Sequence, residues 1–298
     1  MYPQLIQEFV DQESLPETYA ADAENWFLPL IEELDALIVP SVRPLIIGIN
    51  GAQGTGKSTL ASLISLLLGE QGYRVAKLSL DDFYLSRERR TELAQQVHPL
   101  LASRGVPGTH NTAQAITTLA ELSRATAADH IALPVFDKSR DDCASEDQFK
   151  SIHGPIDVIL LEGWFTGAAA QSAAELEVPV NELERNEDRD GRWRHFVNQQ
   201  LDTEYQPLFA SIQFLIMLQA PDFGRVFEWR SKQESKMRAR SGEHGEGLMD
   251  AAALSRFVQH FERLTRHCLN SLPGRADVVF RLDDEHRIAA RLDKSSAN

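Results

Sequence analysis

The feature that most constrains this chain is a glycine-rich loop between an apolar run and an amphipathic segment. The loop reads GAQGTGKS at residues 51–58 and matches G-x-x-x-x-G-K-[ST] at each fixed position. The apolar run before it, LIIGI at 45–49, predicts a buried parallel strand. After the loop, apolar residues recur at helical spacing, at Leu60, Leu63, Ile64, Leu67 and Leu68. The loop therefore has the strand–loop–helix context in which this pattern binds phosphate.

The residue types in the loop suit a polyphosphate. Glycines let several backbone N–H groups converge on one anion, and the helix that begins here adds its positive end. We expect Lys57 to contact the terminal phosphates and Ser58 to offer its hydroxyl to Mg²⁺. The expected nucleotide contacts are Gly51, Ala52, Gln53, Gly54, Thr55, Gly56, Lys57, Ser58 and Thr59. A glycine-rich turn with an incidental lysine is the alternative, and the flanking strand and helix argue against it.

Length and charge narrow the class of protein further. The 298 residues are enough for one large α/β domain or two small ones, and the formal net charge of -14 argues against nucleic acid or an anionic membrane as partner. Cys143 and Cys268 have neither disulfide-framework nor metal-site spacing, which suits a reducing compartment. The N-terminal residues lack the order of a signal peptide, and no apolar run approaches membrane-spanning length. We expect a cytoplasmic protein; its oligomeric state, monomer or dimer, stays open.

The pattern along the chain predicts one domain, residues 1–298, of the α/β class. Residues 1–43 form a helical N-terminal extension, either a cover packed on the core or an amphipathic partner-binding helix. Within the core at 44–298, apolar runs at 74–80, 131–136, 158–161, 214–218 and 278–280 predict further strands. Strands alternating with helices imply a three-layer α/β/α sandwich with a mainly parallel central sheet. The charged run at 182–194 is expected to be a solvated surface.

Two acidic residues stand where strands are predicted to end. Ligands of parallel sheets bind at the carboxyl ends of the strands, so Asp81 and Glu162 should converge on the same crevice as Lys57. Phosphoryl transfer to an alcohol needs a phosphate cradle, Mg²⁺, a base and cations on the migrating group. We assign Lys57, Asp81 and Glu162 as catalytic, with Asp81 as base, and Ser58, Asp81 and Glu162 as the metal-binding set. The alternative for Asp81 is a cap of a helix or turn.

Basic residues gather at 225–240 in an otherwise acidic chain, at Arg225, Arg230, Lys232, Lys236, Arg238 and Arg240. One interpretation is a solvated helix that Glu228 and Glu234 neutralise in part. The other is a mobile lid that brings guanidinium groups onto the phosphates of ATP. The excess of positive charge favours the lid, with Arg225 and Arg230 as its nucleotide contacts.

Candidate residues for a phosphoryl acceptor follow the second strand. Tyr84 closes the DDFY segment, Arg104 and His110 lie in SRGVPGTHN, and Lys138 lies in PVFDKS. Glycine- and proline-containing loops of this kind can hold an anionic acceptor. They can equally be surface turns, and the sequence leaves both interpretations open.

The ordered set of motifs resembles a known family. The segments are GINGAQGTGKSTL, LSLDDFYL, RGVPGTH, LPVFDKS, LLEGWF, LQAPDF and EWRSKQE, and the resemblance covers residues 26–282. In this order they resemble the D-glycerate 3-kinase family, which belongs with phosphoribulokinase, uridine kinase and pantothenate kinase. The resemblance implies the P-loop NTPase fold and transfer of the γ-phosphate of ATP, with Mg²⁺, to a small hydroxylated acceptor, D-glycerate being the best single candidate. It matches Asp81 to the family's acid after the second strand and Glu162 to its strand-end acid.

Two acceptor-side loops depart from the family pattern. After Ser139 the family is glycine-rich with an Arg-Gly-Asp-Arg-like run, whereas residues 140–145 here read RDDCAS. The family's RGxxGxHD ends here in His110-Asn111. These departures leave the acceptor open, with a nucleoside or another sugar acid as alternatives. A non-catalytic ATP-binding regulator is the alternative from another class.

Overall fold

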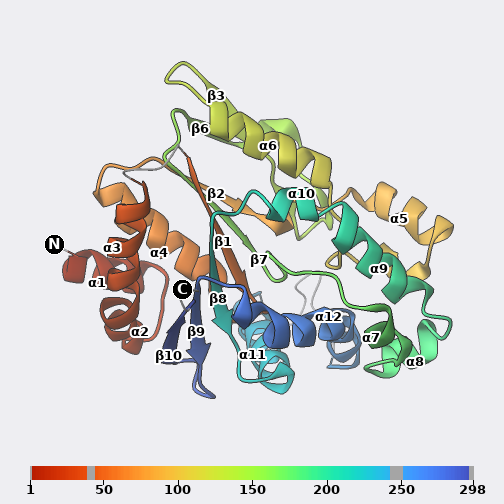
Figure 1. Cartoon of the computed structure of the whole chain (residues 1–298). Coiled ribbons are helices and arrows are strands. Elements are labelled where there is room, and N and C mark those ends of the chain that lie inside the picture. Colours follow the sequence, from red (N-terminus) through yellow and green to blue (C-terminus); the bar gives the residue numbers. More distant parts are fainter. Residues whose placement is uncertain (1, 39–43, 242–250, 295–298) are drawn as a thin grey trace.

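A six-stranded sheet lies at the centre of the molecule, in the order β10-β9-β8-β1-β7-β2 (Figure 1). The computed structural model describes residues 2–38, 44–241 and 251–294, and the side chains of 233–241 and 251–252 lie outside that description. The strands of the sheet are β1 (Leu45–Gly51), β2 (Val75–Ser79), β7 (Val158–Gly163), β8 (Phe214–Gln219), β9 (Val278–Leu282) and β10 (Ile288–Asp293). The pairs β1–β7, β1–β8, β2–β7 and β8–β9 are parallel, and β10 runs antiparallel to β9.

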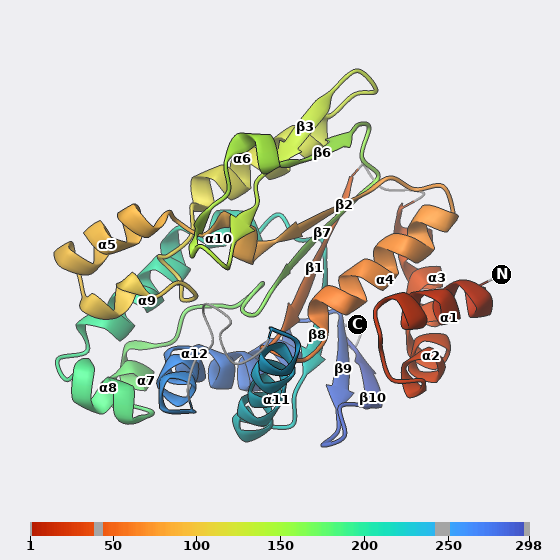
Figure 2. The ribbon, with the colours of Figure 1, turned by 180° about the vertical axis from the view of Figure 1, so that it is seen from behind.

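Side chains on the two faces of the sheet enter two different hydrophobic cores. In β1, Ile47 and Ile49 pack into one core and Ile46 into the other, because successive side chains of a strand point to opposite faces. The first core includes α4 (Lys57–Glu70), and the second includes α6 (Thr112–Arg124) and α10 (Gln206–Phe209) (Figures 1 and 2). Helices therefore cover both faces of a mainly parallel sheet, and the predicted three-layer α/β/α fold is confirmed.

The helical N-terminal extension predicted for residues 1–43 is present over residues 2–38, and 39–43 lie outside the described residues. It consists of α1 (Tyr2–Gln12), α2 (Thr18–Asp22), the π-helical segment η1 (Ala23–Phe27) and α3 (Leu28–Ile38). Its apolar face joins the core that contains α4, and the ring of Phe27 meets the edge of Phe280 in β9 at 5.3 Å. Two ion pairs, Asp22–Arg287 and Glu33–Arg291, tie the extension to the β9–β10 hairpin and to β10. The extension is thus a cover of the sheet edge.

The segment 131–136 does not add a strand to the central sheet. Its first part forms β3 (His130–Leu133), which pairs antiparallel with β6 (Lys150–His153), and β4 (Phe136–Asp137) pairs with β5 (Asp142–Cys143). Because β7 pairs with both β1 and β2, the chain between β2 and β7 forms a separate excursion. The remaining elements between β2 and β6 are η2 (Leu80–Phe83), α5 (Arg87–Gln96), η3 (Pro99–Ala102) and η4 (Glu146–Gln148).

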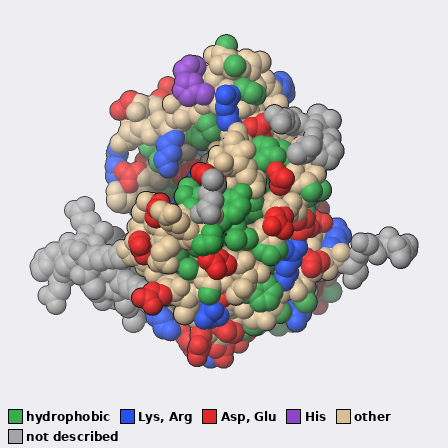
Figure 3. Space-filling view, turned by 90° about the vertical axis from the view of Figure 1, so that its left-hand side faces the viewer, with side chains coloured by type: hydrophobic (Ala, Val, Ile, Leu, Met, Phe, Trp, Pro, Cys, Tyr) green, Lys and Arg blue, Asp and Glu red, His purple; other side chains and the backbone are tan. Residues whose placement is uncertain are grey.

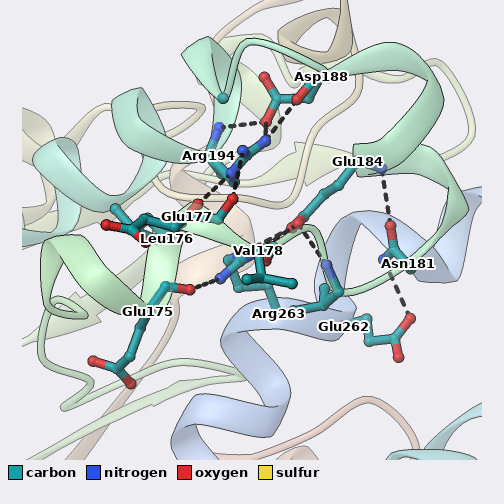
Figure 4. A network of polar contacts seen from close by, with 12 residues as sticks. Glu175, Leu176, Glu177, Val178, Asn181, Glu184, Asp188, Arg194, Glu262 and Arg263 are labelled. Carbon is teal, nitrogen blue, oxygen red and sulfur yellow. Dashed lines mark hydrogen bonds and ion pairs between the residues drawn. The ribbon is translucent and has the colours of Figure 1, made fainter.

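The charged run at 182–194 is a solvated surface only in part: Glu182, Arg185, Glu187, Arg189, Asp190 and Arg192 are exposed, whereas three other charged residues are buried, which the prediction missed. It spans α8 (Glu182–Glu187) and the start of α9 (Arg192–Thr203), next to α7 (Ala173–Glu177). Glu184 and Asp188 are fully buried, and Arg194 is 5% exposed. Arg194 pairs with Asp188 at 2.9 Å, and Arg263 of α12 (Ala251–Ser271) pairs with Glu184 at 2.7 Å (Figure 4).

Backbone carbonyls complete this buried network. Arg194 Nε donates to the Leu176 carbonyl at 2.6 Å, and Arg263 Nη1 donates to the Glu175 carbonyl at 2.8 Å. Burying charges is costly unless each is paired and hydrogen-bonded, and this condition is met here. The partner Arg263 comes from a distant helix, so the local sequence did not reveal it.

Two further helices complete the fold, α11 (Phe223–Ser241) and the short η5 (Leu272–Gly274).

No helix in the described ranges combines the length and apolar character that crossing a bilayer requires. On the face that Figure 3 shows, Asp and Glu side chains gather around a central area of hydrophobic side chains.

The buried ion pairs yield a stability prediction. Glu184→Ala leaves the Arg263 guanidinium buried without its counter-charge, so the free energy of unfolding should fall by about 3–5 kcal/mol. The matched control is Glu187→Ala, because the Glu187 and Arg256 side chains are 41% and 50% exposed. Exposed pairs contribute about 0–1 kcal/mol. Urea unfolding followed by fluorescence measures both values, and equal losses in the two variants would contradict this account of the network.

Candidate active site

The phosphate loop has the backbone shape that its sequence predicts. Gly56, the residue before α4, has a φ of 90°, which is in the left-handed region that glycine adopts without strain. A Cβ on Gly51 would lie 2.5 Å from Thr55 Oγ1, so only glycine fits at the end of β1. Lys57 is the first residue of α4, whose first N–H groups have no partner within the helix. The loop is thus a cradle for an anion at a helix N-terminus.

Glu162 lies directly beside this cradle. In the parallel register Glu162 of β7 is level with Ile49 of β1 and Ser79 of β2. Ser58 Oγ donates a hydrogen bond to Glu162 Oε1 at 2.7 Å. The second oxygen, Oε2, is buried and has no partner among the described residues. A hydroxyl and a carboxylate with a free oxygen are the ligand types that Mg²⁺ prefers, so these residues fit that ion.

Few protein groups are available here to coordinate a metal ion, which is compatible with Mg²⁺ bound mainly by the phosphates of a nucleotide. Within the described ranges there is no group of three or more His, Cys, Asp or Glu side chains that could hold a metal. Mg²⁺ in kinases keeps several waters and takes phosphate oxygens as ligands, so it needs few protein groups. Ser58 and Glu162 are in contact, whereas Asp81, the third residue of the predicted set, has other partners.

Asp81 follows β2 in η2 and carries two hydrogen bonds on its carboxylate. Lys138 Nζ donates to Oδ2 at 2.7 Å, and the Tyr84 hydroxyl donates to Oδ1 at 2.9 Å. Burial alone would raise the pKa of Asp81. The positive charges of Lys138 and Lys57 together outweigh this effect and lower the pKa to about 2. Asp81 is therefore ionised at neutral pH, within the electrostatic reach of Lys57. The structure brings together Lys57, Asp81, Tyr84 and Lys138, which the sequence separates by up to 81 positions.

Aromatic rings pack behind Asp81. Tyr84 stacks on His110 with ring centroids 4.3 Å apart, and burial, followed by the charge of Asp81, raises the pKa of Tyr84 well above its usual value. His110 is buried, and this lowers its pKa to about 3 although Asp81 acts in the opposite direction. Its Nδ1 lies 2.7 Å from the Tyr205 hydroxyl, and its Nε2 has no partner among the described residues.

Tyr205 contacts the candidate site through His110, and the sequence analysis missed it. Its oxygen accepts a hydrogen bond from the Gly108 N–H at 3.0 Å and also lies in hydrogen-bonding contact with His110 Nδ1. No motif surrounds Tyr205 in the sequence, so no local signal marked it.

Arg104 lies on the same side of Asp81 as Tyr84, and its guanidinium forms an ion pair with a carboxylate. Its guanidinium pairs with Asp141 and lies over the Phe136 ring, 5.4 Å from the centroid. Asp141 also pairs with the buried Arg90 at 3.0 Å and has a φ of 54°. The segment that departs from the family pattern thus supplies the carboxylate that neutralises Arg104.

The basic segment at 225–240 lies in the helix α11, and the predicted nucleotide contacts of Arg225 and Arg230 stay a prediction. Arg225 pairs with Glu228 at 2.7 Å and Asp284 at 2.8 Å. Trp229 instead contacts the loop, since a Cβ on Gly54 would lie 3.0 Å from Trp229 Cβ. The backbone N of Arg230 lies 3.7 Å from the same position. The side chains of Lys236, Arg238 and Arg240 lie outside the described residues, so the lid stays a prediction.

A phosphate cradle, a strand-end acid on its serine and a second acid beside its lysine, on an α/β/α sandwich, define a P-loop kinase. No protein-family model matches the chain. An uncharacterized kinase of Schizosaccharomyces pombe, mug58, is 33% identical over 235 residues, 74% of this chain and 80% of that protein. The chloroplastic D-glycerate 3-kinase of Arabidopsis thaliana is 30% identical over 227 residues, 74% of this chain but 46% of that protein.

A solved structure of D-glycerate 3-kinase from Cryptococcus neoformans has the same fold. Its TM-score is 0.70 at 24% identity, covering 89% of this chain and 99% of that one. The chain belongs to the D-glycerate 3-kinase-like family of P-loop kinases. It is an ATP-binding phosphotransferase with an alcohol group as acceptor, which favours an enzyme over the non-catalytic regulator.

The two lysines beside Asp81 generate a pH prediction. An Asp whose pKa is lowered by folding adds stability above its unfolded pKa of about 3.8, and this contribution is lost as the pH falls towards 2. Lys138→Met removes a cation and leaves the burial in place, so the pKa of Asp81 should rise by at least about 1 unit. Carbon-13 NMR titration of the aspartate carboxyls, with the Asp81 signal assigned from Asp81→Asn, measures it.

Lys150→Met is the control for this titration, because Lys150 acts on the pKa of Asp82 and not on that of Asp81. An Asp81 pKa that stays near 2 in Lys138→Met would show that Lys138 does not set it.

Proposed function

We propose that this protein transfers the γ-phosphate of ATP, with Mg²⁺, to a hydroxyl group of D-glycerate. The observation that carries the proposal is the meeting of three groups at the carboxyl ends of the neighbouring strands β1, β7 and β2: the Ser58–Glu162 contact of 2.7 Å, Lys57 and the ionised Asp81. A P-loop kinase needs these groups around the migrating phosphoryl group. The proposal treats residues 1–298 as one kinase domain.

Each group has a separate task in this proposal. The loop and Lys57 bind the phosphates, while Ser58 and Glu162 hold Mg²⁺. When bound, Mg²⁺ neutralises charge on the phosphates. Asp81 accepts the hydrogen bond, and later the proton, of the acceptor hydroxyl. Because the transition state of phosphoryl transfer is loose, the proton leaves late and a carboxylate of low pKa is a sufficient acceptor.

Two cations lie on the acceptor side of Asp81, which supports an anionic acceptor. Lys138 contacts Asp81, and Arg104 acts on the neighbouring Tyr84; each cation is paired with an acid, Asp81 and Asp141 respectively. A carboxylate of the acceptor can replace either acid as partner of these cations. His110 adds a buried ring nitrogen, Nε2, which has no partner among the described residues, and Tyr84 adds a hydroxyl. We assign Tyr84, Arg104, His110 and Lys138 to the acceptor.

A nucleoside acceptor is the less favoured alternative within kinases. It would need an open apolar pocket beside Asp81. The cavity of about 500 Å³ that adjoins Lys57 has neither Asp81 nor Tyr84 in its lining. The names of two relatives, from Arabidopsis and Cryptococcus, also favour D-glycerate.

The role of Asp81 predicts the effect of Asp81→Asn. The variant should lose about 10²–10⁴-fold in kcat, while ATP affinity changes little, because the amide cannot take the hydroxyl proton. Steady-state kinetics and ATP titration measure the two quantities. The matched control is Asp82→Asn, because within the described part of the chain Asp82 accepts only a long backbone contact, from Phe136 at 3.4 Å. Equal losses in both variants, or full activity of Asp81→Asn, would contradict the assignment.

The acceptor itself is tested with the unaltered protein. ADP release is measured with ATP, Mg²⁺ and one of D-glycerate, uridine, pantothenate or ribulose 5-phosphate. We expect acceptor-dependent turnover with D-glycerate and its loss when Mg²⁺ is removed by chelation. Turnover with another member of this panel alone would replace D-glycerate as the acceptor. ATP binding without turnover on any of them, or on a wider metabolite set, would count against a kinase.

A further inference from the structure

Two histidines lie side by side on the strand pair β3–β6, outside the residues assigned to the proposed chemistry. His130 begins β3 and His153 ends β6, and the antiparallel register places them directly opposite each other. Their ring centroids are 3.9 Å apart, and the ring planes are inclined by 61°. The two strands lie beside α6 at one end of the molecule (Figures 1 and 2), and Figure 3 shows histidine side chains together at that end. The two imidazoles are thus in direct contact.

The backbone itself holds these two side chains close together. The Gly154 N–H donates to the Asp129 carbonyl at 3.2 Å, which makes Asp129 and Gly154 a hydrogen-bonded pair of the ladder. Hydrogen-bonded and non-hydrogen-bonded pairs alternate along an antiparallel ladder, so His130 and His153 form a non-hydrogen-bonded pair. Opposite side chains approach most closely in pairs of this kind. The contact between the two rings is therefore a consequence of the register.

Both histidines lie on the outer face of the strand pair. Ile131 is 7% exposed and belongs to the core that contains α6, and its cross-strand partner Ile152 packs against the same core. Successive side chains of a strand point to opposite faces, so His130 and His153 point away from this core. Both are exposed, and a ligand can therefore reach them from solvent.

Two adjacent imidazoles are a chelating pair for a transition metal. The imidazole ring is the commonest metal ligand in proteins and suits Zn²⁺, Ni²⁺ and Cu²⁺. An ion about 2.0–2.1 Å from each nitrogen needs the two nitrogens about 3–3.5 Å apart. Rings with centroids 3.9 Å apart can reach this separation by small side-chain rotations, which exposed residues make freely. The second imidazole then acts at a high effective concentration, so the pair binds an ion more tightly than one histidine does.

Negative charge beside the pair also favours a cation. The carboxylate of Asp129 is within electrostatic reach of His130. Hydrogen bonds from the Thr126 hydroxyl and N–H lower the pKa of Asp129, and His130 adds to this effect, so the carboxylate is ionised at neutral pH. Across the part of the chain that the structure describes, no third His, Cys, Asp or Glu side chain completes a metal-binding cluster. Water would therefore fill the remaining coordination positions.

We propose that His130 and His153 together bind one divalent transition metal ion of the kind that imidazole prefers, Zn²⁺, Ni²⁺ or Cu²⁺. The ion joins β3 to β6 at the end of the strand pair that is remote from residues 134–149. That intervening segment carries Lys138 and Asp141, so the ion fastens the base of the segment that brings Lys138 to Asp81. This site is separate from the Mg²⁺ site of the proposed function and does not rest on it.

The test is a calorimetric titration of the full chain, without an affinity tag, with Ni²⁺ in an excess of Mg²⁺. We expect one Ni²⁺ to bind per chain, and each of His130→Gln and His153→Gln to weaken this binding at least about tenfold, because each variant leaves a single imidazole. The matched control is His195→Gln, because His195 is exposed on α9, away from this strand pair. Its Ni²⁺ affinity should change less than about twofold. Circular dichroism shows that each variant is folded.

Hydrogen exchange locates the ion. Amide exchange in β3 and β6 should slow when Ni²⁺ is added to the unaltered protein and should not slow in His153→Gln. Ni²⁺ affinity that is unchanged in either His130→Gln or His153→Gln, or that falls equally in His195→Gln, would overturn the inference. Binding of Ni²⁺ without slower exchange in β3 and β6 would place the ion elsewhere and overturn it as well. Absence of acceptor-dependent turnover would count against the proposed kinase and leave this metal site intact.

Discussion

The hydrogen bond between Ser58 and Glu162 joins the phosphate loop to the neighbouring strand, and the arrangement of the site depends on it. Glu162 stands near the end of the buried strand β7, and Ser58 lies in the first turn of α4, which follows the loop after β1. The strands are fixed by two hydrophobic cores, so the two side chains have little freedom to separate. The unpartnered Glu162 Oε2 shows that the contact leaves capacity for another ligand. A cation that neutralises phosphate is the ligand this carboxylate suits.

The charges around Asp81 show how an acidic protein can offer cations to the anionic ligands of the proposed reaction. The chain carries a net charge of -14, yet Lys57 and Lys138 are concentrated at one point. These cations keep the pKa of Asp81 at about 2. Burial lowers the pKa of His110 to about 3, so its imidazole is neutral at neutral pH. At neutral pH the ionised Asp81 and the neutral His110 therefore lie close together, each in one protonation state. This suits a site where the migrating group brings most of the negative charge.

Parts far from the loop stabilise the site on both sides. The region of α7, α8 and α9 is fastened to α12 by the buried pair of Glu184 and Arg263, and α9 leads to Tyr205 behind His110. At the opposite edge, Asp22 and Arg287 fasten the N-terminal helices to the hairpin. Both fastenings use bidentate or multiply hydrogen-bonded charges, which define position more strictly than apolar contacts do. The site is thus supported from two directions.

The sequence by itself determined the elements whose information is local. The loop motif, the apolar strand before it and the acids at 81 and 162 could be placed because a parallel sheet aligns its strand ends, whatever the details of packing. Tyr205 and the partner of Glu184 could not, since 95 positions separate Tyr205 from His110 and 79 separate Arg263 from Glu184. The same holds for Trp229 and His286, whose stacking requires α11 and the hairpin to meet beside the loop. Local pattern sets which residues face a core or end a strand, whereas only tertiary packing decides which distant side chains meet, because those contacts depend on the whole arrangement of helices around the sheet.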